Sequence, residues 1–238
     1  MSGRGARPWA VPHRRPAMHS LCLRPGISFG RIQGDLVFLD IERDRYFTLR
    51  GEAARLFKAC CETDVRDLDP KAKAHLLATG LMEEVARGVR PVAARAEIPL
   101  KGLFELPGEQ ARPGILAALE IAGRLVPIRR ALARAGVARR VRRIESMKTG
   151  LRPAHGKADL LKLARRFNAA RPLVPVTRNC LSDSLACLEF LLSRRAWADL
   201  VFGVKLSPFA AHAWVQTDDL ILNDHVDYVS EYTPVLVA

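Results

Sequence analysis

Residues 175–195 read PVTRNCLSDSLACLEFLLSRR, and this stretch predicts a helix that faces a hydrophobic core. One side of the helix is made of leucines three or four residues apart, the spacing of a buried helix face: Leu181, Leu185, Leu188 and Leu192. Thr177 or Asn179 can cap the helix, so Cys180 falls in its first turn. Exposed backbone N–H groups and the positive end of the helix dipole stabilise a thiolate there, which favours Cys180 as a nucleophile.

The other four cysteines lack this position. Cys187 lies two turns deeper in the same helix, Cys60 and Cys61 fall inside a predicted helix, and Cys22 lies in an N-terminal tail. We interpret all four as structural or incidental. Five cysteines without CxxC spacing indicate neither a disulfide framework nor a metal site. Free thiols in a reducing compartment are the simplest interpretation, so we expect a cytoplasmic protein.

Two β-prone runs near the C-terminus, 211–216 and 220–223, predict a hairpin around a three-residue connection centred on Asp218. In that register residues whose numbers sum to 436 face each other, so His212 faces Asp224. Their Cβ atoms would lie about 4.5–5.5 Å apart. A carboxylate at this distance can bond one imidazole nitrogen and leave the other for a thiol. The sequence therefore predicts a catalytic set of Cys180, His212 and Asp224.

Two of these residues, His212 and Asp224, also have a structural alternative. A histidine on a strand is more often a satisfied surface or core residue, and Asp224 equally fits a turn that ends the strand. His225 and Asp227 are the nearest substitutes, but His225 is out of phase with Asp224 in the predicted hairpin. The combination of a helix-capping cysteine, a histidine and a register-matched aspartate favours catalysis.

The N-terminal part predicts a basic tail and then a small folded module. Residues 1–24 are rich in Arg, Pro and Gly without an apolar period, which predicts disorder. Residues 25–87 predict a β-β-β-α-α module, with Asp69-Pro70 starting the second helix and Gly80 ending it. The expected elements are strands Ile27–Ile32, Leu36–Ile41 and Tyr46–Leu49, then helices Gly51–Cys61 and Pro70–Thr79.

The middle of the chain predicts a linker and two helices. Residues 88–110 are rich in Gly and Pro and are the expected linker to a domain over residues 111–238. A helix over Ile115–Val126 should end at Pro127, and an arginine-rich helix should follow to about Ile144. A solvated helix with one buried face is one interpretation of the second helix. A surface for an acidic partner, a membrane or a peptide is the other.

The net charge of +13 is concentrated in the middle of the chain. Residues 112–171 hold 16 basic and 3 acidic side chains, whereas residues 172–238 hold 4 basic and 8 acidic ones. The predicted chemistry of the C-terminal region therefore does not depend on nucleic acid. No apolar run reaches the roughly 18 residues of a membrane-spanning helix, and no apolar segment follows the basic N-terminus as in a secretory signal.

Residues 172–228 contain four dense motifs in one order: NCLxxSLA from Asn179, ADLVFGV from Ala198, PFAAHAWV from Pro208 and LND from Leu222. In these motifs the stretch resembles the B proteins of lasso peptide biosynthesis. The resemblance implies an α+β fold, in which a small winged-helix-like domain precedes a transglutaminase/papain-like cysteine peptidase domain. It implies that Cys180 is the nucleophile, His212 the general base and acid, and Asp224 the carboxylate that orients His212.

The reaction that the resemblance implies is removal of the leader from a ribosomally made precursor peptide. A partner cyclase similar to asparagine synthetase then closes the macrolactam. The precursor and this cyclase are the expected partners, and nucleic acid and metal ions are not expected. Membrane association stays open. No firmly bound cofactor is expected, while an ATP dependence exerted through the cyclase also stays open.

The resemblance further implies that residues 25–87 are a precursor recognition element. An extended leader would add a strand to the edge of the three-stranded meander. The expected leader-binding residues are those of the third strand and the residue before it: Arg45, Tyr46, Phe47, Thr48 and Leu49. Two other functions stay open, namely transglutaminase-type acyl transfer and a non-catalytic module that binds peptide or nucleic acid.

Overall fold

The computed structural model describes residues 20–62, 68–86, 88–107, 111–112, 114–154 and 156–238. Contacts divide the chain into two compact units, residues 1–24 with 55–91 and residues 25–54 with 92–238. We call them the small unit and the large unit. The chain is α+β, as predicted. The predicted recognition element over residues 25–87 has residues in both units, and its assignment as one domain stays a prediction.

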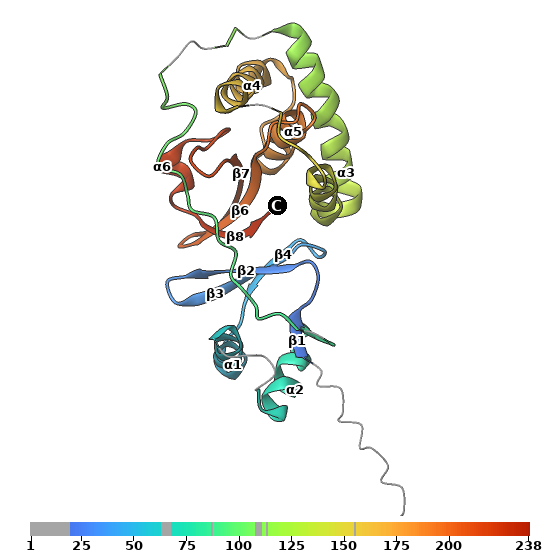
Figure 1. Cartoon of the computed structure of the whole chain (residues 1–238), viewed down its shortest axis with the longest axis vertical. Coiled ribbons are helices and arrows are strands. Elements are labelled where there is room, and N and C mark those ends of the chain that lie inside the picture. Colours follow the sequence, from blue (N-terminus) through green and yellow to red (C-terminus); the bar gives the residue numbers. More distant parts are fainter. Residues whose placement is uncertain (1–19, 63–67, 87, 108–110, 113, 155) are drawn as a thin grey trace, which may run out of the picture. The chain divides into compact units, whose positions relative to one another are not determined.

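The small unit pairs two strands that are far apart in sequence (Figure 1). Strand β1 (Ser20–Leu23) runs antiparallel to β5 (Met82–Val85). The predicted disorder of residues 1–24 is therefore wrong for residues 20–23, because this pairing satisfies their backbone; residues 1–19 lie outside the described residues. The boundary between the two units lies within helix α1 (Gly51–Glu62). In the part of α1 that belongs to the small unit, Phe57 and Cys60 are buried.

Helix α2 (Pro70–Ala78) begins and ends as the sequence predicts. The Asp69 carboxylate accepts hydrogen bonds from the N–H groups of Lys71 and Ala72 at 3.0 and 3.3 Å. Pro70 occupies the first turn, where its missing N–H removes no helical bond. Gly80 has a φ of 71°, a left-handed value that terminates the helix at low steric cost.

The large unit begins with the predicted meander. Strands β2 (Ile27–Ile32), β3 (Asp35–Asp40) and β4 (Arg45–Thr48) form one antiparallel sheet in the order β2-β3-β4. A tight turn with positive φ at Gln33 and Gly34 joins the first two strands. The strand β8 (Thr233–Val237) lies close to β2, and an added Cβ at Gly30 would approach the Pro234 carbonyl oxygen to 2.4 Å.

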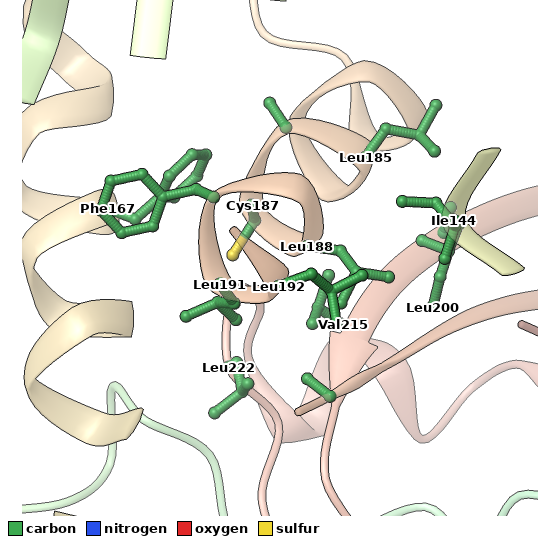
Figure 2. Close-up of a cluster of buried hydrophobic side chains, with 14 of the residues drawn as sticks. Ile144, Phe167, Leu185, Cys187, Leu188, Leu191, Leu192, Leu200, Val215 and Leu222 are labelled. Atoms are coloured by element: carbon green, nitrogen blue, oxygen red, sulfur yellow. The ribbon is translucent and has the colours of Figure 1, made fainter. Parts of the chain in front are cut away.

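The C-terminal part of the large unit is a sheet covered by helices. Strands β6 (Asp199–Leu206), β7 (Phe209–Gln216) and β8 are antiparallel in the order β7-β6-β8. Helix α5 (Cys180–Leu192) is the predicted leucine-rich helix, and Leu185, Leu188 and Leu191 are fully buried. Figure 2 shows α5 between Phe167 on one side and Leu200 and Val215 of the sheet on the other.

Two more helices pack in this part of the chain. Helix α4 (Lys157–Ala170) was not predicted, although Leu160, Ala164 and Phe167 are buried at helical spacing. A short helix, α6 (Val226–Val229), follows the predicted hairpin. None of the helices in the described ranges is long and apolar enough to cross a membrane.

Helix α3 (Ile115–Lys148) differs from the prediction of two helices divided at Pro127. Pro127 lies inside the helix, and the interruption falls at Gly136, which has φ 70° and ψ −178°. Proline removes a single N–H donor, which a helix with good tertiary packing can tolerate. Glycine has no Cβ, so it accepts the left-handed φ that turns the chain. The predicted apolar stripe is confirmed, since Ile128, Val141 and Ile144 are buried.

The predicted linker is not a free segment over its described residues, 88–107. The Ala94 N–H donates to the Phe29 carbonyl at 2.8 Å, and the Leu103 N–H donates to the Ile221 carbonyl at 2.7 Å. The Gln216 side chain donates to the Glu97 carbonyl at 2.9 Å. Residues 92–107 therefore belong to the large unit. Residues 108–110 lie outside the described residues.

The approach of Gly30 to Pro234 generates a stability prediction. Gly30→Ala should lower the free energy of unfolding by about 2–3 kcal/mol, because the new Cβ would overlap a backbone oxygen that cannot rotate away. Gly123→Ala is the matched control: it lies within α3 with no atom within 4 Å of its added Cβ, and should raise stability by about 0.5–1 kcal/mol. Guanidinium denaturation measures both. Equal stability of the two variants would contradict the packing of β2 on β8.

Candidate active site

Cys180 is the first residue of helix α5, as predicted. Of the two candidate caps, Asn179 is the one used, and its side chain accepts a hydrogen bond from the Ser182 N–H at 3.0 Å. Cys180 is half-buried, so its sulfur combines the polar helix end with partial access to solvent. This is the environment in which a thiolate is stabilised yet still reachable.

His212 lies on β7 opposite Gly203 of β6, and only 7% of it is exposed. Its ring is enclosed by aromatic side chains: the Tyr228, Tyr232 and Trp214 ring centroids are 4.9, 5.2 and 6.1 Å away. Gly203 makes room for this cluster, because an added Cβ would lie 2.6 Å from the Trp214 ring and 2.9 Å from the Tyr232 Cβ. The imidazole therefore has little freedom to rotate.

Asp224 lies beside His212, but the predicted hairpin register is wrong by one residue. Gln216 pairs with Ile221, and the Leu222 N–H donates to the Val215 carbonyl at 2.8 Å. The numbers of facing residues therefore sum to 437, whereas the predicted register has a sum of 436. The connection between them is four residues long, closed by the Thr217 N–H on the Leu220 carbonyl at 2.8 Å. The ladder ends before Asp224, and the Asp224 carboxylate reaches His212 Nε2 at 2.6 Å.

A hydrogen-bonded pair of side chains, Asn223 and Ser184, joins the three elements that carry Cys180, His212 and Asp224. Asn223 accepts from the Val215 N–H of β7 at 2.7 Å and donates to the Ser184 hydroxyl of α5 at 2.8 Å. Ser184 in turn donates to the carbonyl of Ala213, next to His212, at 2.9 Å. These bonds fix the spacing between helix, strand and the segment of Asp224.

The sequence prediction missed both of these residues, although two signals were present. Ser184 lies one helical turn after Cys180, on the side of α5 that faces β7. Asn223 directly precedes Asp224. Tyr228 and Tyr232 were also missed, because their place around His212 depends on tertiary packing.

The electrostatics of the site favour a charged pair of Cys180 and His212. Burial would raise the pKa of Cys180, but the His212 side chain and the backbone N–H groups of Ala213 and Leu181 hold it below its ordinary value of 9.0. Burial would lower the pKa of His212, yet hydrogen bonds to Asp224 and Cys180 raise it to about 9. A thiolate beside an imidazolium is the form that both shifts favour.

The two imidazole nitrogens have separate tasks. Nε2 bonds the Asp224 carboxylate at 2.6 Å, so Nδ1 is the nitrogen that remains for the Cys180 sulfur. Asp224 also accepts from the His225 N–H at 2.8 Å through its second oxygen, which fixes the carboxylate plane. The arrangement can form a sulfur nucleophile at a pH below the ordinary thiol pKa and hold a proton beside it for a leaving group.

A cavity of about 390 Å³ lies beside Cys180 and Asp224. Its wall includes Asn168, Asp183 and Arg171, and the last two form a partly buried ion pair at 3.1 Å. Such a cavity is large enough for a side chain of a peptide substrate. No group of three or more His, Cys, Asp or Glu side chains in the described part of the chain is arranged to hold a metal ion.

The alternative residues do not enter this arrangement. His225 is exposed, with Nδ1 3.3 Å from a Glu105 carboxylate oxygen, while Asp227 lies in the short helix α6. Cys187 is fully buried, and burial raises its pKa. Burial also raises the pKa of Cys60 to about 11, and burial and Glu83 raise that of Cys22.

The predicted leader-binding residues occupy β4 and the position after it. Within the described part of the chain β4 pairs with β3 alone, so it is an edge strand of the three-stranded sheet. The Tyr46 ring packs edge-on against Phe209 at 5.8 Å, and Phe209 opens strand β7. Leader binding by Arg45–Thr48 and Leu49 stays a prediction.

Comparison with known proteins identifies the family of the C-terminal part. Residues 122–237 match the family model described as the transglutaminase-like superfamily, and all three candidate catalytic residues fall within the match. The chain therefore contains a transglutaminase-like superfamily domain. No curated protein and no solved structure gives a significant match.

The pKa shifts predict the pH dependence of Cys180 reactivity. Because the pKa of Cys180 is lowered, its alkylation by iodoacetamide should rise with pH at values below the ordinary 9.0. Asp224→Asn should move this rise to higher pH, since a His212 without the carboxylate holds its proton less tightly and stabilises the thiolate less. Mass spectrometry of the labelled peptide measures the rate. An inflection equal to that of the denatured chain would contradict the charged pair.

The side-chain pair of Asn223 and Ser184 generates a second prediction. Ser184→Ala and Asn223→Ala should each slow Cys180 alkylation severalfold at neutral pH and cost about 1–3 kcal/mol of stability, because each leaves a buried polar partner unpaired. Thr217→Ala is the control in the same connection, since its hydroxyl bonds the exposed Asp219 carboxylate at 3.0 Å. Equal alkylation rates in all three variants would show that the bonds do not position the site.

Proposed function

We propose that this protein is a cysteine peptidase that removes the leader from a ribosomally made precursor peptide, as in lasso peptide biosynthesis. The observation that supports it most is the set of Cys180, His212 and Asp224, with His212 bonded to Asp224 at 2.6 Å inside a transglutaminase-like domain. That domain alone supports the coarser statement, cysteine peptidase or acyl transferase activity. The specific substrate rests on the motif resemblance given above.

In the proposed reaction the Cys180 thiolate attacks the scissile carbonyl carbon and forms a C–S bond. The His212 imidazolium, held by Asp224, gives its proton to the departing amine as the C–N bond breaks. An acyl-enzyme remains on Cys180. Water then attacks the thioester carbonyl while His212 takes a proton from it, and the C–S bond breaks to release the leader carboxylate and restore the thiolate.

The N–H of Cys180 is the oxyanion donor that we propose. It belongs to the first turn of α5, where backbone N–H groups have no partner within the helix. The Leu181 and Ala213 N–H groups instead face the sulfur and lower the pKa of its thiol. Separate donors for the sulfur and for the substrate oxygen fit a reaction in which negative charge moves from one to the other.

Strand β4 is the proposed site of the leader. Its free edge can accept an extended peptide as a further antiparallel or parallel strand, and main-chain hydrogen bonds would supply much of the affinity. The Tyr46–Phe209 contact supports this placement, because Phe209 lies on the same strand as His212, three residues before it. A peptide bound along β4 is thereby held in the same compact unit as the catalytic residues.

Acyl transfer to an amine is the second candidate, because the same acyl-enzyme can react with an amine in place of water. The transglutaminase-like match supports it equally. The partner cyclase, similar to asparagine synthetase, belongs to the proposal for hydrolysis: hydrolysis frees an α-amine on the core peptide, which a cyclising enzyme needs as its nucleophile.

The test incubates the full-length protein with its precursor peptide and follows product masses. Cys180→Ala should abolish cleavage, a loss of roughly a thousandfold or more, and should bind the leader as tightly as the parent. Cys22→Ala is the matched control at a half-buried cysteine of the small unit and should cleave normally. Asp224→Asn should be severely impaired, whereas Asp227→Asn in α6 should not.

Each other outcome points to a different function. A product heavier by an added amine would replace hydrolysis with acyl transfer. Cleavage by Cys180→Ala at the parental rate would overturn the nucleophile. Leader binding without any covalent change in the parent protein would leave a non-catalytic binding module.

A further inference from the structure

The interruption of helix α3 creates a second cavity, distinct from the one beside Cys180. Gly136 interrupts the helix, and Figure 1 draws α3 as two arms that point in different directions. A hollow of about 590 Å³ lies against residues on both sides of the break. The two cavities share no lining residue. Five arginines from the two arms of the helix line this hollow: Arg130, Arg134, Arg139, Arg140 and Arg143.

Two of these arginines are held in place. Arg140 donates to the Pro127 carbonyl across the break at 2.8 Å, which ties the second arm to the first. Arg140 and Arg143 both approach the same Glu189 carboxylate oxygen, at 3.4 and 3.3 Å. The Glu189 side chain is only 6% exposed, so this anion serves the two arginines and is shielded from solvent. One carboxylate for two guanidinium groups leaves part of their charge unneutralised.

The other three arginines have no anionic partner among the described residues. Arg130, Arg134 and Arg139 are exposed, and the described side chains offer none of them a hydrogen bond or an ion pair. The hollow thus carries five guanidinium groups and one carboxylate, an excess of four positive charges. Like charges repel one another, and an anion bound between them would relieve that repulsion.

We propose that this hollow, the arginine pocket, binds a compact oligophosphate. A phosphate chain carries several negative charges in a small volume, and guanidinium forks match its oxygens in pairs. The volume falls in the range of small-ligand sites. The site is independent of the proposed peptidase function, since it uses none of the residues assigned to the leader or to catalysis.

Other polyanions fit the arginine pocket less well. The arginines converge on a hollow, whereas a membrane or a nucleic acid duplex presents charge along a plane or a line and would contact only some of them. The apolar lining consists of Pro127, Ala131 and Ala135, with no large side chain to enter a lipid layer. An acidic peptide carries about one charge per side chain, too few in this volume to meet four positive charges.

The test is isothermal titration of the full-length protein with inorganic tripolyphosphate at constant ionic strength. Binding at one site per chain is expected, and sodium sulfate at the same ionic strength should not reproduce it. A parallel titration with adenosine triphosphate distinguishes the sources of the phosphate chain. Tighter binding than tripolyphosphate assigns a nucleotide, and equal or weaker binding assigns a free oligophosphate.

Variants then locate the site. The triple change Arg130→Gln, Arg134→Gln and Arg139→Gln should weaken tripolyphosphate binding about tenfold or more. The control removes the same charge from exposed positions elsewhere in the large unit, with Arg50→Gln, Lys101→Gln and Arg112→Gln, and should change the affinity less than about twofold.

A pair of glycine variants tests the shape of the arginine pocket without changing its charge. Gly136→Ala should weaken binding severalfold because alanine disfavours a φ of 70°, while Gly123→Ala in the first arm should bind normally. The proposal is overturned if tripolyphosphate does not bind, or if the control triple variant loses as much affinity as the pocket variant. If the protein prefers polyglutamate, duplex DNA or anionic vesicles to tripolyphosphate, and the pocket variant loses that binding, the oligophosphate proposal is wrong. The preferred polyanion is then the partner of the pocket.

Discussion

The hydrogen bond from the Asn223 amide to the Ser184 hydroxyl joins the helix that begins at Cys180 to the segment that carries Asp224. Catalysis by three side chains on three elements needs those elements fixed to within a fraction of an ångström. Apolar packing around α5 brings them near each other, but it is non-directional. The polar links through Asn223 and Ser184 add direction, because each bond specifies an angle as well as a distance.

A second set of contacts explains how a charged pair persists in a largely buried place. A thiolate and an imidazolium both lose hydration there, and each would revert to its neutral form without compensating contacts. Asp224 stabilises the imidazolium, while the Leu181 and Ala213 N–H groups stabilise the thiolate. The aromatic rings of Tyr228, Tyr232 and Trp214 keep the imidazole in one orientation, so the compensation is in place before a substrate arrives.

Sequence patterns predicted the elements that depend on neighbouring residues. The leucine spacing of α5, the Asp69 cap of α2 and the β2-β3-β4 meander are all local signals, and all three are confirmed. The pairing of β1 with β5 was missed, because about sixty residues separate the two strands and no local signal marks their partner. The interruption of α3 at Gly136 and not at Pro127 depends on how both arms pack, which sequence periodicity does not contain.

The candidate site was predicted for a partly wrong reason. His212 and Asp224 do lie together, yet the register that predicted it is shifted by one residue, and the chain leaves the ladder at Asn223 to bring Asp224 back. Hairpin register depends on loop length, and three- and four-residue connections are hard to distinguish from sequence. The Asn223 side chain accepts the hydrogen bond from the Val215 N–H that a backbone carbonyl of a paired strand would otherwise accept. This role of Asn223 becomes visible only in the structure.

The contact between Gly30 and Pro234 also limits how the chain can be recombined. The atom nearest to an added Cβ at Gly30 is a backbone oxygen, with the Val235 side chain next at 3.0 Å, so no change of a β8 side chain can remove the overlap. A chimaera that takes its N-terminal strands from another protein must bring a glycine, and the same strand curvature, to this position. The meander is thus less an exchangeable module than a layer matched in shape to the catalytic sheet.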